Sequence, residues 1–365
     1  MKLNCSKLEL YKLVSLAERN TSKNPTLLTL SSILLRTGKN RLIVMGTNLE
    51  VGFEGSLAAK IEREGEVLPP AKTILSILYS ISDPDITLES QNNNLKITSK
   101  TSTSSIKCLP IDEFPVIPKV KKENYFTIPW EVLTTALKNT IPATATTYTK
   151  PELSSVYIFS QGKSPLTFVA TDSFRLAEQK TEVSYPSLSI LLPQKSGQEV
   201  IRIFEDSPEE IEVVFNRNQI IFQNRTISFL SRLTEGKFPE YQGIIPKSFE
   251  TQAVIDKNQL INAVRAAGIF SSRLSEVTLA VETSKGTIDI KSASSETGEY
   301  RASHLVKTSG PSIEANFNYH YLLEAIESVP NAKIFLGFNG PQKAVLVKGL
   351  DNNNYIHLVM PMRGI

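Results

Sequence analysis

The segments EFPVIPK (residues 113–119) and KFPEYQGIIPK (residues 237–247) are two versions of one linker, and their Phe-Pro pairs begin at Phe114 and Phe238. A proline-containing tract between two patterned stretches is typical of a boundary between domains. The chain has 365 residues, too many for one ordinary domain of roughly 100–200 residues. We therefore expect three domains, at residues 1–122, 123–248 and 249–365.

Each of the three stretches opens with the same two elements. A short alternating run is followed by a segment whose apolar residues recur every three or four positions, which is the spacing of an amphipathic helix. In the first such helix these residues are Leu10, Leu13, Val14 and Ala17. The strand and helix pairs are expected at 1–6 with 7–20, 124–129 with 130–140, and 250–256 with 257–270.

The same order of elements then continues in every stretch. Two β-branched runs predict a hairpin, as at 154–160 and 165–177, and a second helix follows Pro70 and Pro193 in the first two stretches. Three strands close each cycle. A period near 123 residues, repeated three times, favours duplication over unrelated neighbouring domains. The predicted fold class is α+β, with three repeated domains that each hold two helices and about eight strands.

The composition is that of a soluble globular protein, with 41% hydrophobic and 21% charged residues. No run approaches the roughly 18 apolar residues of a membrane span, and the N-terminus turns polar at once, so we expect a cytoplasmic protein without a membrane partner. Cys5 and Cys108 are far apart and are expected to be small buried apolar residues. His304, His320 and His357 lack the spacing of metal ligands, and no cofactor is expected.

Charge is distributed unevenly along the chain. The net charge is +5 for residues 1–122, −3 for residues 123–250 and +1 for residues 251–365. A protein that holds nucleic acid by charge alone usually has a clear basic excess. Any contact with DNA is therefore expected to be local and weak.

Eight short motifs, in one order along the whole chain, resemble the bacterial sliding DNA clamp family, the beta subunit of DNA polymerase III. They are NPTLLTLSSILL (24–35), TNLEVGFEG (47–55), LPPAKTILSIL (68–78), CLPIDEFPVI (108–117), VATDSFRLA (169–177), LTEGKFPEYQGIIPK (233–247), FNYHYLLEAIES (317–328) and VMPMR (359–363). The resemblance implies a processivity factor that is not an enzyme. It implies that each chain is half of a closed head-to-tail homodimeric ring around double-stranded DNA, with helices lining the hole.

A ring that slides needs weak basic contacts, because strong phosphate contacts would slow its movement. The basic residues expected to face DNA are Lys12, Arg19, Lys72, Lys138, Lys195, Arg202 and Arg265. Lys23 and Asn24 stand where the family usually has an arginine that touches DNA. Each of these side chains could equally belong to an ordinary solvated helix face.

The resemblance also implies a pocket for a short peptide with a glutamine and hydrophobic anchors. Such peptides are carried by the DNA polymerase III catalytic subunit, the clamp loader and other replication and repair proteins. The pocket residues carried over are Thr171, Ser173, Phe174, Arg175, Leu176, Pro239, Gly243, Ile244, Tyr321, Ala344, Leu358, Val359, Met360, Pro361, Met362 and Arg363. Ser173 with Phe174, Gly243, and the tail of Gly364 and Ile365 depart from the usual family pattern.

The expected dimer contact joins the first domain of one copy to the third domain of the other. The matching residues are Ile106, Ile269, Phe270, Glu296 and Glu299. The three apolar residues of this set could instead be core residues.

Two other functions remain open from the sequence. An enzyme would need a catalytic motif, and neither a GxSxG elbow nor a phosphate-binding loop is present in the chain. A monomeric adaptor that keeps the peptide pocket without closing a ring would share all the pocket residues, so only its association state separates it from a clamp.

Overall fold

The computed structural model describes residues 1–23, 27–147, 149–162, 164–205 and 210–362. The chain forms two compact units. Unit 1 contains Met1–Trp130 and Arg202–Leu233, and unit 2 contains Glu131–Ile201 and Thr234–Ile365. The second of the three predicted domains therefore contributes to both units, and the predicted domain boundaries stay a prediction.

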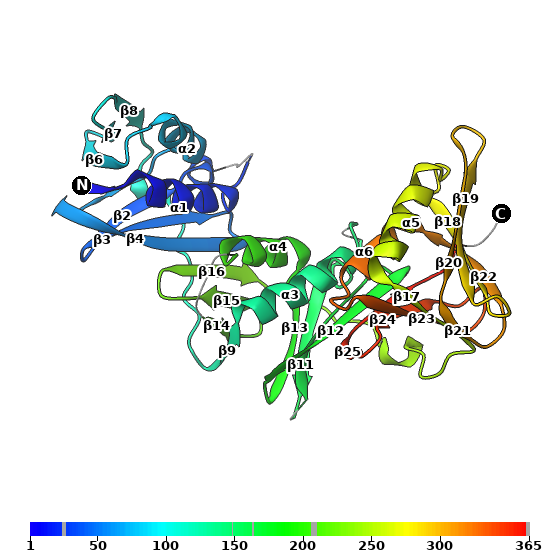
Figure 1. Ribbon diagram of the computed structural model, residues 1–365. Coiled ribbons are helices and arrows are strands. Elements are labelled where there is room, and N and C mark those ends of the chain that lie inside the picture. The colour runs from blue at the N-terminus through cyan, green and yellow to red at the C-terminus, as the bar shows by residue number, and fades with distance from the viewer. Residues whose placement is uncertain (24–26, 148, 163, 206–209, 363–365) are drawn as a thin grey trace. The chain divides into compact units, whose positions relative to one another are not determined.

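Unit 1 is built on one sheet in the order β8-β7-β6-β1-β4-β16-β15-β14-β9, with β3 beside β4, β2 beside β3, and β5 beside β2. Its helices α1 (Lys7–Arg19) and α2 (Ala71–Ser80) pack against each other, and α1 also lies on β3 and β4 (Figure 1). The strands are β1 (Lys2–Ser6), β2 (Leu34–Gly38), β3 (Arg41–Thr47), β4 (Val51–Arg63), β5 (Glu66–Val67), β6 (Asp85–Gln91), β7 (Asn94–Thr98), β8 (Thr103–Lys107), β9 (Asn124–Pro129), β14 (Glu210–Phe215), β15 (Gln219–Gln223) and β16 (Ile227–Arg232).

Unit 2 holds two sheets, one in the order β13-β10-β11-β12-β25-β24-β23-β17-β21 and one in the order β20-β19-β18-β22. Its helices are α3 (Trp130–Thr140), α4 (Gln194–Ile203), α5 (Lys257–Ile269) and α6 (Tyr319–Glu327), of which α5 and α6 pack together. The strands are β10 (Ser155–Gln161), β11 (Pro165–Thr171), β12 (Arg175–Ser184), β13 (Ser187–Pro193), β17 (Thr251–Asp256), β18 (Glu276–Glu282), β19 (Thr287–Ser294), β20 (Gly298–Leu305), β21 (Lys307–Ser309), β22 (Ile313–Asn318), β23 (Lys333–Phe338), β24 (Val345–Gly349) and β25 (Asn352–Val359).

The element order confirms the threefold repeat. Strand β1 and helix α1 correspond to β9 with α3 and to β17 with α5, and each repeat continues with a second helix and three closing strands. The predicted fold class, α+β with two helices and about eight strands in each repeat, is therefore correct.

Helices α1, α5 and α6 each begin after a residue whose side chain caps the first turn. The Asp256 carboxylate accepts hydrogen bonds from the backbone N–H groups of Asn258 and Gln259, at 2.9 and 3.1 Å, and so caps α5. Pro70 directly precedes α2 and Pro193 directly precedes α4, where a missing N–H costs nothing. No helix in the described part of the chain is long and apolar enough to span a membrane.

The expected hairpin differs in one respect from the structure. The run at 165–177, expected as its second arm, is two strands, β11 and β12, joined by a tight turn, and β3 and β4 are joined in the same way. Leu49 and Ser173 occupy these turns with φ angles of 75° and 79°. Such left-handed residues are uncommon outside glycine, so the alternating pattern gave no sign of the reversal.

Candidate functional site

The turn between β11 and β12 is fixed by its own side chains. The Thr171 hydroxyl donates to the Arg175 carbonyl at 2.7 Å and accepts from the Ser173 N–H at 3.1 Å. The Asp172 carboxylate accepts from the backbone N–H groups of Phe174 and Arg175, at 2.9 and 3.0 Å. These bonds pair backbone N–H and C=O groups that have no strand partner in the turn. They explain how the polar TDSFR segment keeps a single backbone conformation.

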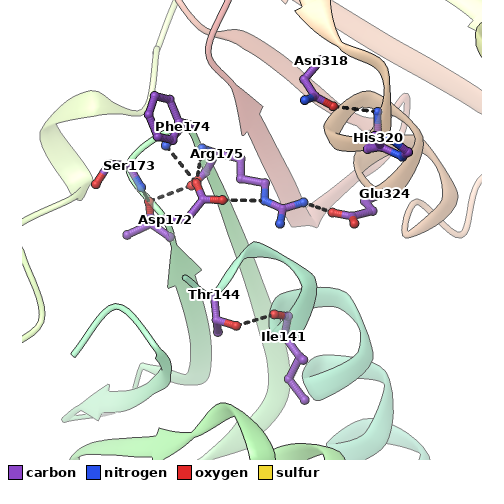
Figure 2. Close-up of polar contacts among 10 residues, drawn as sticks. Ile141, Thr144, Asp172, Ser173, Phe174, Arg175, Asn318, His320 and Glu324 are labelled. Carbon is purple, nitrogen blue, oxygen red and sulfur yellow. Dashed lines mark hydrogen bonds and ion pairs between the residues drawn. The ribbon is translucent and has the colours of Figure 1, made fainter. Parts of the chain in front are cut away.

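Arg175 connects this turn to helix α6. Its Nε donates to the Asp172 carboxylate at 2.9 Å, and its guanidinium forms an ion pair with Glu324 (Figure 2). The guanidinium also lies 4.1 Å from the ring centroid of Tyr321. Because only 8% of the Arg175 side chain is exposed, these contacts are shielded from water and hold the turn against α6.

A cavity of about 440 Å³ opens beside the turn. Leu176 and Leu358, which face each other across β12 and β25, form its buried floor. Ile244 and Pro246 of the linker form one wall, and the loop before β24 forms another with Lys343 and further polar residues. A mostly apolar cavity with a few polar groups at its edge suits an extended peptide with hydrophobic anchors.

Basic side chains project from several helices. Lys12 and Arg19 are exposed on α1, opposite its buried face. Lys72 on α2, Lys138 on α3, and Lys195 with Arg202 on α4 are exposed as well, as is Lys23 after α1. Arg265 on α5 is exposed but donates to the Glu327 carboxylate at 2.6 Å, which offsets its charge. Asn24 lies outside the described residues.

Several strands of the described chain pair on one side only. They include β8 of unit 1, which pairs with β7, and β20 of unit 2, which pairs with β19. Ile269, at the end of α5, is 71% exposed, while the neighbouring Phe270 stacks on Tyr300 of β20 with ring centroids 6.1 Å apart. Unit 2 thus has an uncovered strand edge and a protruding apolar side chain.

Models of three consecutive domains match nearly the whole chain. They are described as the N-terminal domain of the DNA polymerase III beta subunit at residues 1–118, its central domain at 127–240, and its C-terminal domain at 242–363. The chain belongs to the DNA polymerase III beta subunit family. Its membership places it among the sliding clamps of DNA replication.

Individual relatives agree with this assignment. The chain is 25% identical to the "Beta sliding clamp" of Staphylococcus epidermidis, over 94% of this chain and 94% of the relative. A DNA polymerase sliding clamp from Bacillus subtilis has the same fold, with a TM-score of 0.95 at 24% identity and full coverage of both chains. A DnaN sliding clamp from Pseudomonas aeruginosa, solved bound to griselimycin, gives a TM-score of 0.94 at 25% identity, also over 100% of both chains.

The cavity brings together half of the predicted pocket residues. Those that line it are Thr171, Ser173, Arg175, Leu176, Ile244, Ala344, Leu358 and Met360. Those outside its lining are Phe174, Pro239, Gly243, Tyr321, Val359, Pro361 and Met362, and Arg363 lies outside the described residues. Val359 follows Leu358 on β25 and is fully buried, because successive side chains along a strand face opposite sides of the sheet. Tyr321 does not line the cavity but contacts the Arg175 guanidinium.

Four lining residues were missed by the sequence analysis: Pro246, Asn339, Gln342 and Lys343. Pro246 follows the predicted Ile244 closely, and the other three precede Ala344 in the loop between β23 and β24. The tract Gly340-Pro341 marks a turn there, and this turn was the available signal.

Of the two interpretations of Ile106, as a dimer contact or as a core residue, its burial favours the second. It is only 3% exposed and belongs to the core of unit 1. Its neighbours Ser105 and Lys107 face the other way and are not buried. Alternation along β8 therefore leaves the backbone edge, and not the Ile106 side chain, available to a partner. Glu296 pairs with Arg273 at 3.8 Å, and Glu299 is exposed.

A pH dependence of stability follows from His357 on β25. Burial, and then the nearby Arg175 guanidinium, lower the pKa of His357 from 6.5 to about 3. Its Nδ1 lies 2.8 Å from the Tyr355 hydroxyl. Below pH 6.5 the unfolded chain binds a proton that the folded chain does not bind. The free energy of unfolding should therefore fall by about 3 kcal/mol between pH 6.5 and pH 4 through this residue.

Denaturant unfolding at a series of pH values checks this expectation. In His357→Gln the fall over that pH range should be smaller than in the unchanged chain by about the same amount. His320→Gln is the matched control, since His320 is exposed at the start of α6. If the free energy of unfolding falls equally with pH in His357→Gln and in the unchanged chain, His357 is not the source of the pH dependence.

Proposed function

We propose that two copies of this chain close head-to-tail into a ring around duplex DNA and act there as a non-catalytic processivity factor in the cytoplasm. Strand β8 of unit 1 and strand β20 of unit 2 each carry a row of backbone groups without a strand partner on one side. Antiparallel pairing of β8 in one copy with β20 in the other satisfies both rows. Two such contacts, related by twofold symmetry, close a ring of two chains.

Exposed apolar side chains support the same contact. Ile269 is the last residue of α5, which packs against β20 in the third repeat. In the first repeat, Tyr79 at the end of α2 is exposed beside Tyr11, and α2 packs against β8. Burial of these side chains between two copies would add apolar area to the strand pairing. Tyr79 thus takes the place that the sequence analysis gave to Ile106.

The proposed hold on DNA is topological. The seven expected basic side chains that lie on helices are exposed, yet Arg265 is already paired with Glu327, and the net charge of the chain is only +3. Such a charge pattern supports weak, sequence-independent contact with phosphates, which lets a closed ring move along the duplex. The ring then tethers the DNA polymerase III catalytic subunit to its template.

The 440 Å³ cavity of unit 2 is the proposed docking site for partners. The catalytic subunit, the clamp loader and other replication and repair proteins would each insert a peptide with a glutamine and hydrophobic anchors. Leu176 and Leu358 offer an apolar floor, and Met360 adds a flexible wall that can adapt to different anchors. Asn339, Gln342 and Lys343 supply polar groups for the glutamine amide and the peptide backbone.

The observation that carries the proposal is the family match over all three repeats, and the test is topological. The chain is loaded onto nicked circular DNA with a bacterial clamp loader and ATP, and the DNA is then linearised. A ring should remain on the circle and leave the linear molecule. Retention after linearisation would show binding by affinity. A chain that sediments as a monomer at micromolar concentration, but still binds a Gln-x-x-Leu-x-Phe peptide, would instead be an adaptor.

Ile244→Asp is expected to weaken binding of a Gln-x-x-Leu-x-Phe peptide by about 100-fold. A carboxylate on the cavity wall loses its water when a hydrophobic anchor enters, which costs a few kcal/mol. Since Ile244 is exposed in the free chain, its folding should be unaffected. Fluorescence anisotropy of the labelled peptide measures the change.

Leu350→Asp is the matched control for this variant. Leu350 is also an exposed apolar residue of unit 2, but it does not line the cavity. Its peptide affinity should equal that of the unchanged chain. Equal affinities for both variants would place the peptide elsewhere on the surface.

A further inference from the structure

The turn that borders the cavity of unit 2 has a counterpart in unit 1. Thr47 and Thr171 stand 124 positions apart in the chain. The Thr47 hydroxyl donates to the Val51 carbonyl at 2.7 Å and accepts from the Leu49 N–H at 3.1 Å. The Asn48 side chain accepts from the N–H groups of Glu50 and Val51, at 3.0 and 2.9 Å. These four bonds repeat those of the second turn one by one.

The strands behind the two turns are also equivalent. Leu230 on β16 faces Gly52 on β4, as Leu358 on β25 faces Leu176 on β12. In both units a Phe-Pro linker lies over this part of the sheet. A groove of about 580 Å³ opens in unit 1 between its linker and strands β2, β3, β4, β15 and β16. It shares the equivalent positions Gly52, Pro118 and Leu230 with the unit 2 cavity, but the turn at residues 47–51 does not line it. The groove therefore overlaps the counterpart of the cavity and extends over Leu34 and Met45, whose unit 2 counterparts pack in the apolar cluster around Tyr241.

The two sites differ in the hydrogen-bond and ion-pair partners of one glutamate carboxylate. In unit 2 the linker is four residues longer, and its Tyr241 donates a hydrogen bond of 2.6 Å to the buried Glu178 carboxylate. Lys180 lies 3.3 Å from the same carboxylate. The equivalent residue in unit 1 is Glu54, which lies two residues after Gly52 on β4. The shorter linker of unit 1 has no tyrosine that could donate a hydrogen bond to the Glu54 carboxylate. Among the described residues no side chain pairs with the Glu54 carboxylate.

We infer that the groove of unit 1 is a second peptide-binding site, which takes an extended segment with one lysine or arginine between apolar residues. The inference rests on the proposed role of the unit 2 cavity as a peptide site. The ligand's cation would pair with Glu54, which stands exposed between Met45 and Ser228 on the neighbouring strands. Apolar groups beside it, among them Ile43 and Ile117, would take the flanking side chains.

The other charges of the groove restrict the ligand to a single cation. Arg36 is held by Glu66, whose carboxylate accepts from its Nε at 2.8 Å. Lys119 stands on the linker wall and would repel a second positive charge. A run of basic residues should therefore bind less well than one lysine with apolar neighbours. The binding site for polymerase-type peptides in unit 2 has no exposed carboxylate in its lining, so the two sites select different segments.

The test uses the full chain with labelled isoleucine, leucine and methionine methyl groups, observed by NMR. The probe is the peptide Ac-Gly-Leu-Lys-Leu-Val-Gly-NH2, and its control carries Glu in place of Lys. The lysine peptide should shift the methyl signals of Ile43, Met45 and Ile117, and the glutamate peptide should not. In Glu54→Gln the lysine peptide should bind about 10-fold more weakly, since a charge-assisted bond is lost.

Glu64→Gln is the matched variant, because Glu64 is an exposed glutamate of unit 1 outside the groove, and it should leave the affinity unchanged. Ser228→Lys should abolish binding by placing an ammonium group next to Glu54. Unmoved signals of Ile43, Met45 and Ile117, or equal affinities for Glu54→Gln and the unchanged chain, would overturn the inference. Leu176 and Leu358 signals report on the unit 2 cavity with a Gln-x-x-Leu-x-Phe peptide, so failure of either site is recognised separately.

Discussion

Arg175→Ala is expected to lower the free energy of unfolding by about 3 kcal/mol, because it removes the cation from a largely buried cluster. The Asp172 carboxylate would keep its backbone donors but lose the guanidinium at 2.9 Å. Glu324 and the face of Tyr321 would lose their partner as well. Since the turn then has no link to α6, peptide affinity at the cavity should fall together with stability. Denaturant unfolding and peptide anisotropy measure the two effects.

Arg265→Ala is the matched control for this loss. Arg265 also forms an ion pair with a glutamate of α6, at 2.6 Å, but both side chains are largely exposed. An exposed pair of this kind contributes less than about 1 kcal/mol. The loss in free energy of unfolding for Arg175→Lys should lie between those of the two alanine variants. Lysine keeps the positive charge but lacks the planar guanidinium that donates to two partners at once. A loss in Arg175→Ala no larger than in Arg265→Ala would show that burial of the Arg175 cluster has no energetic role.

Ile269→Asp is expected to convert the proposed dimer into monomers at micromolar concentration. The Ile269 side chain is 71% exposed in the single chain, so a carboxylate there stays in water and the fold is unaffected. In the proposed ring contact the same carboxylate would be buried against apolar groups, which weakens association by at least about 100-fold. Sedimentation velocity measures the change, and retention on nicked circular DNA should be lost at the same time.

Val116→Asp provides the control for association. Val116 is an exposed apolar residue of the first linker and takes no part in the proposed contact. Its sedimentation should match that of the unchanged chain. If Ile269→Asp also remains dimeric, the contact between copies must involve another surface.

The repeat and the helices were predictable because they depend on local periodicity. Leu10, Leu13, Val14 and Ala17 are the buried residues of α1, as their spacing indicated. The threefold repeat could be recognised because the predicted helices and strands recur in the same order in each domain. The strand boundaries at Leu49 and Ser173 were not predictable in this way. Their reversal depends on side-chain hydrogen bonds and a left-handed backbone, which leave the alternation of apolar residues unchanged.

The candidate site was predictable only where the family motifs cover it. Arg175 and Leu176 could be carried over from TDSFRLA, but nothing in that motif shows that Arg175 pairs with Glu324, more than one hundred residues away in the chain. The burial of Ile106 also depends on which face of β8 meets the core, and one strand of five residues leaves that choice open.

The floor of the unit 2 cavity has a consequence for inhibitors. Leu176 and Leu358 are paired core residues of adjacent strands as well as the surface on which a ligand would rest. A smaller or polar side chain at either position would leave a void or an unpaired polar group inside the sheet, at a cost of about 2–5 kcal/mol. Resistance to a compound seated on this floor should therefore arise at the exposed rim, at Gln342 or Lys343, where a substitution leaves the sheet intact.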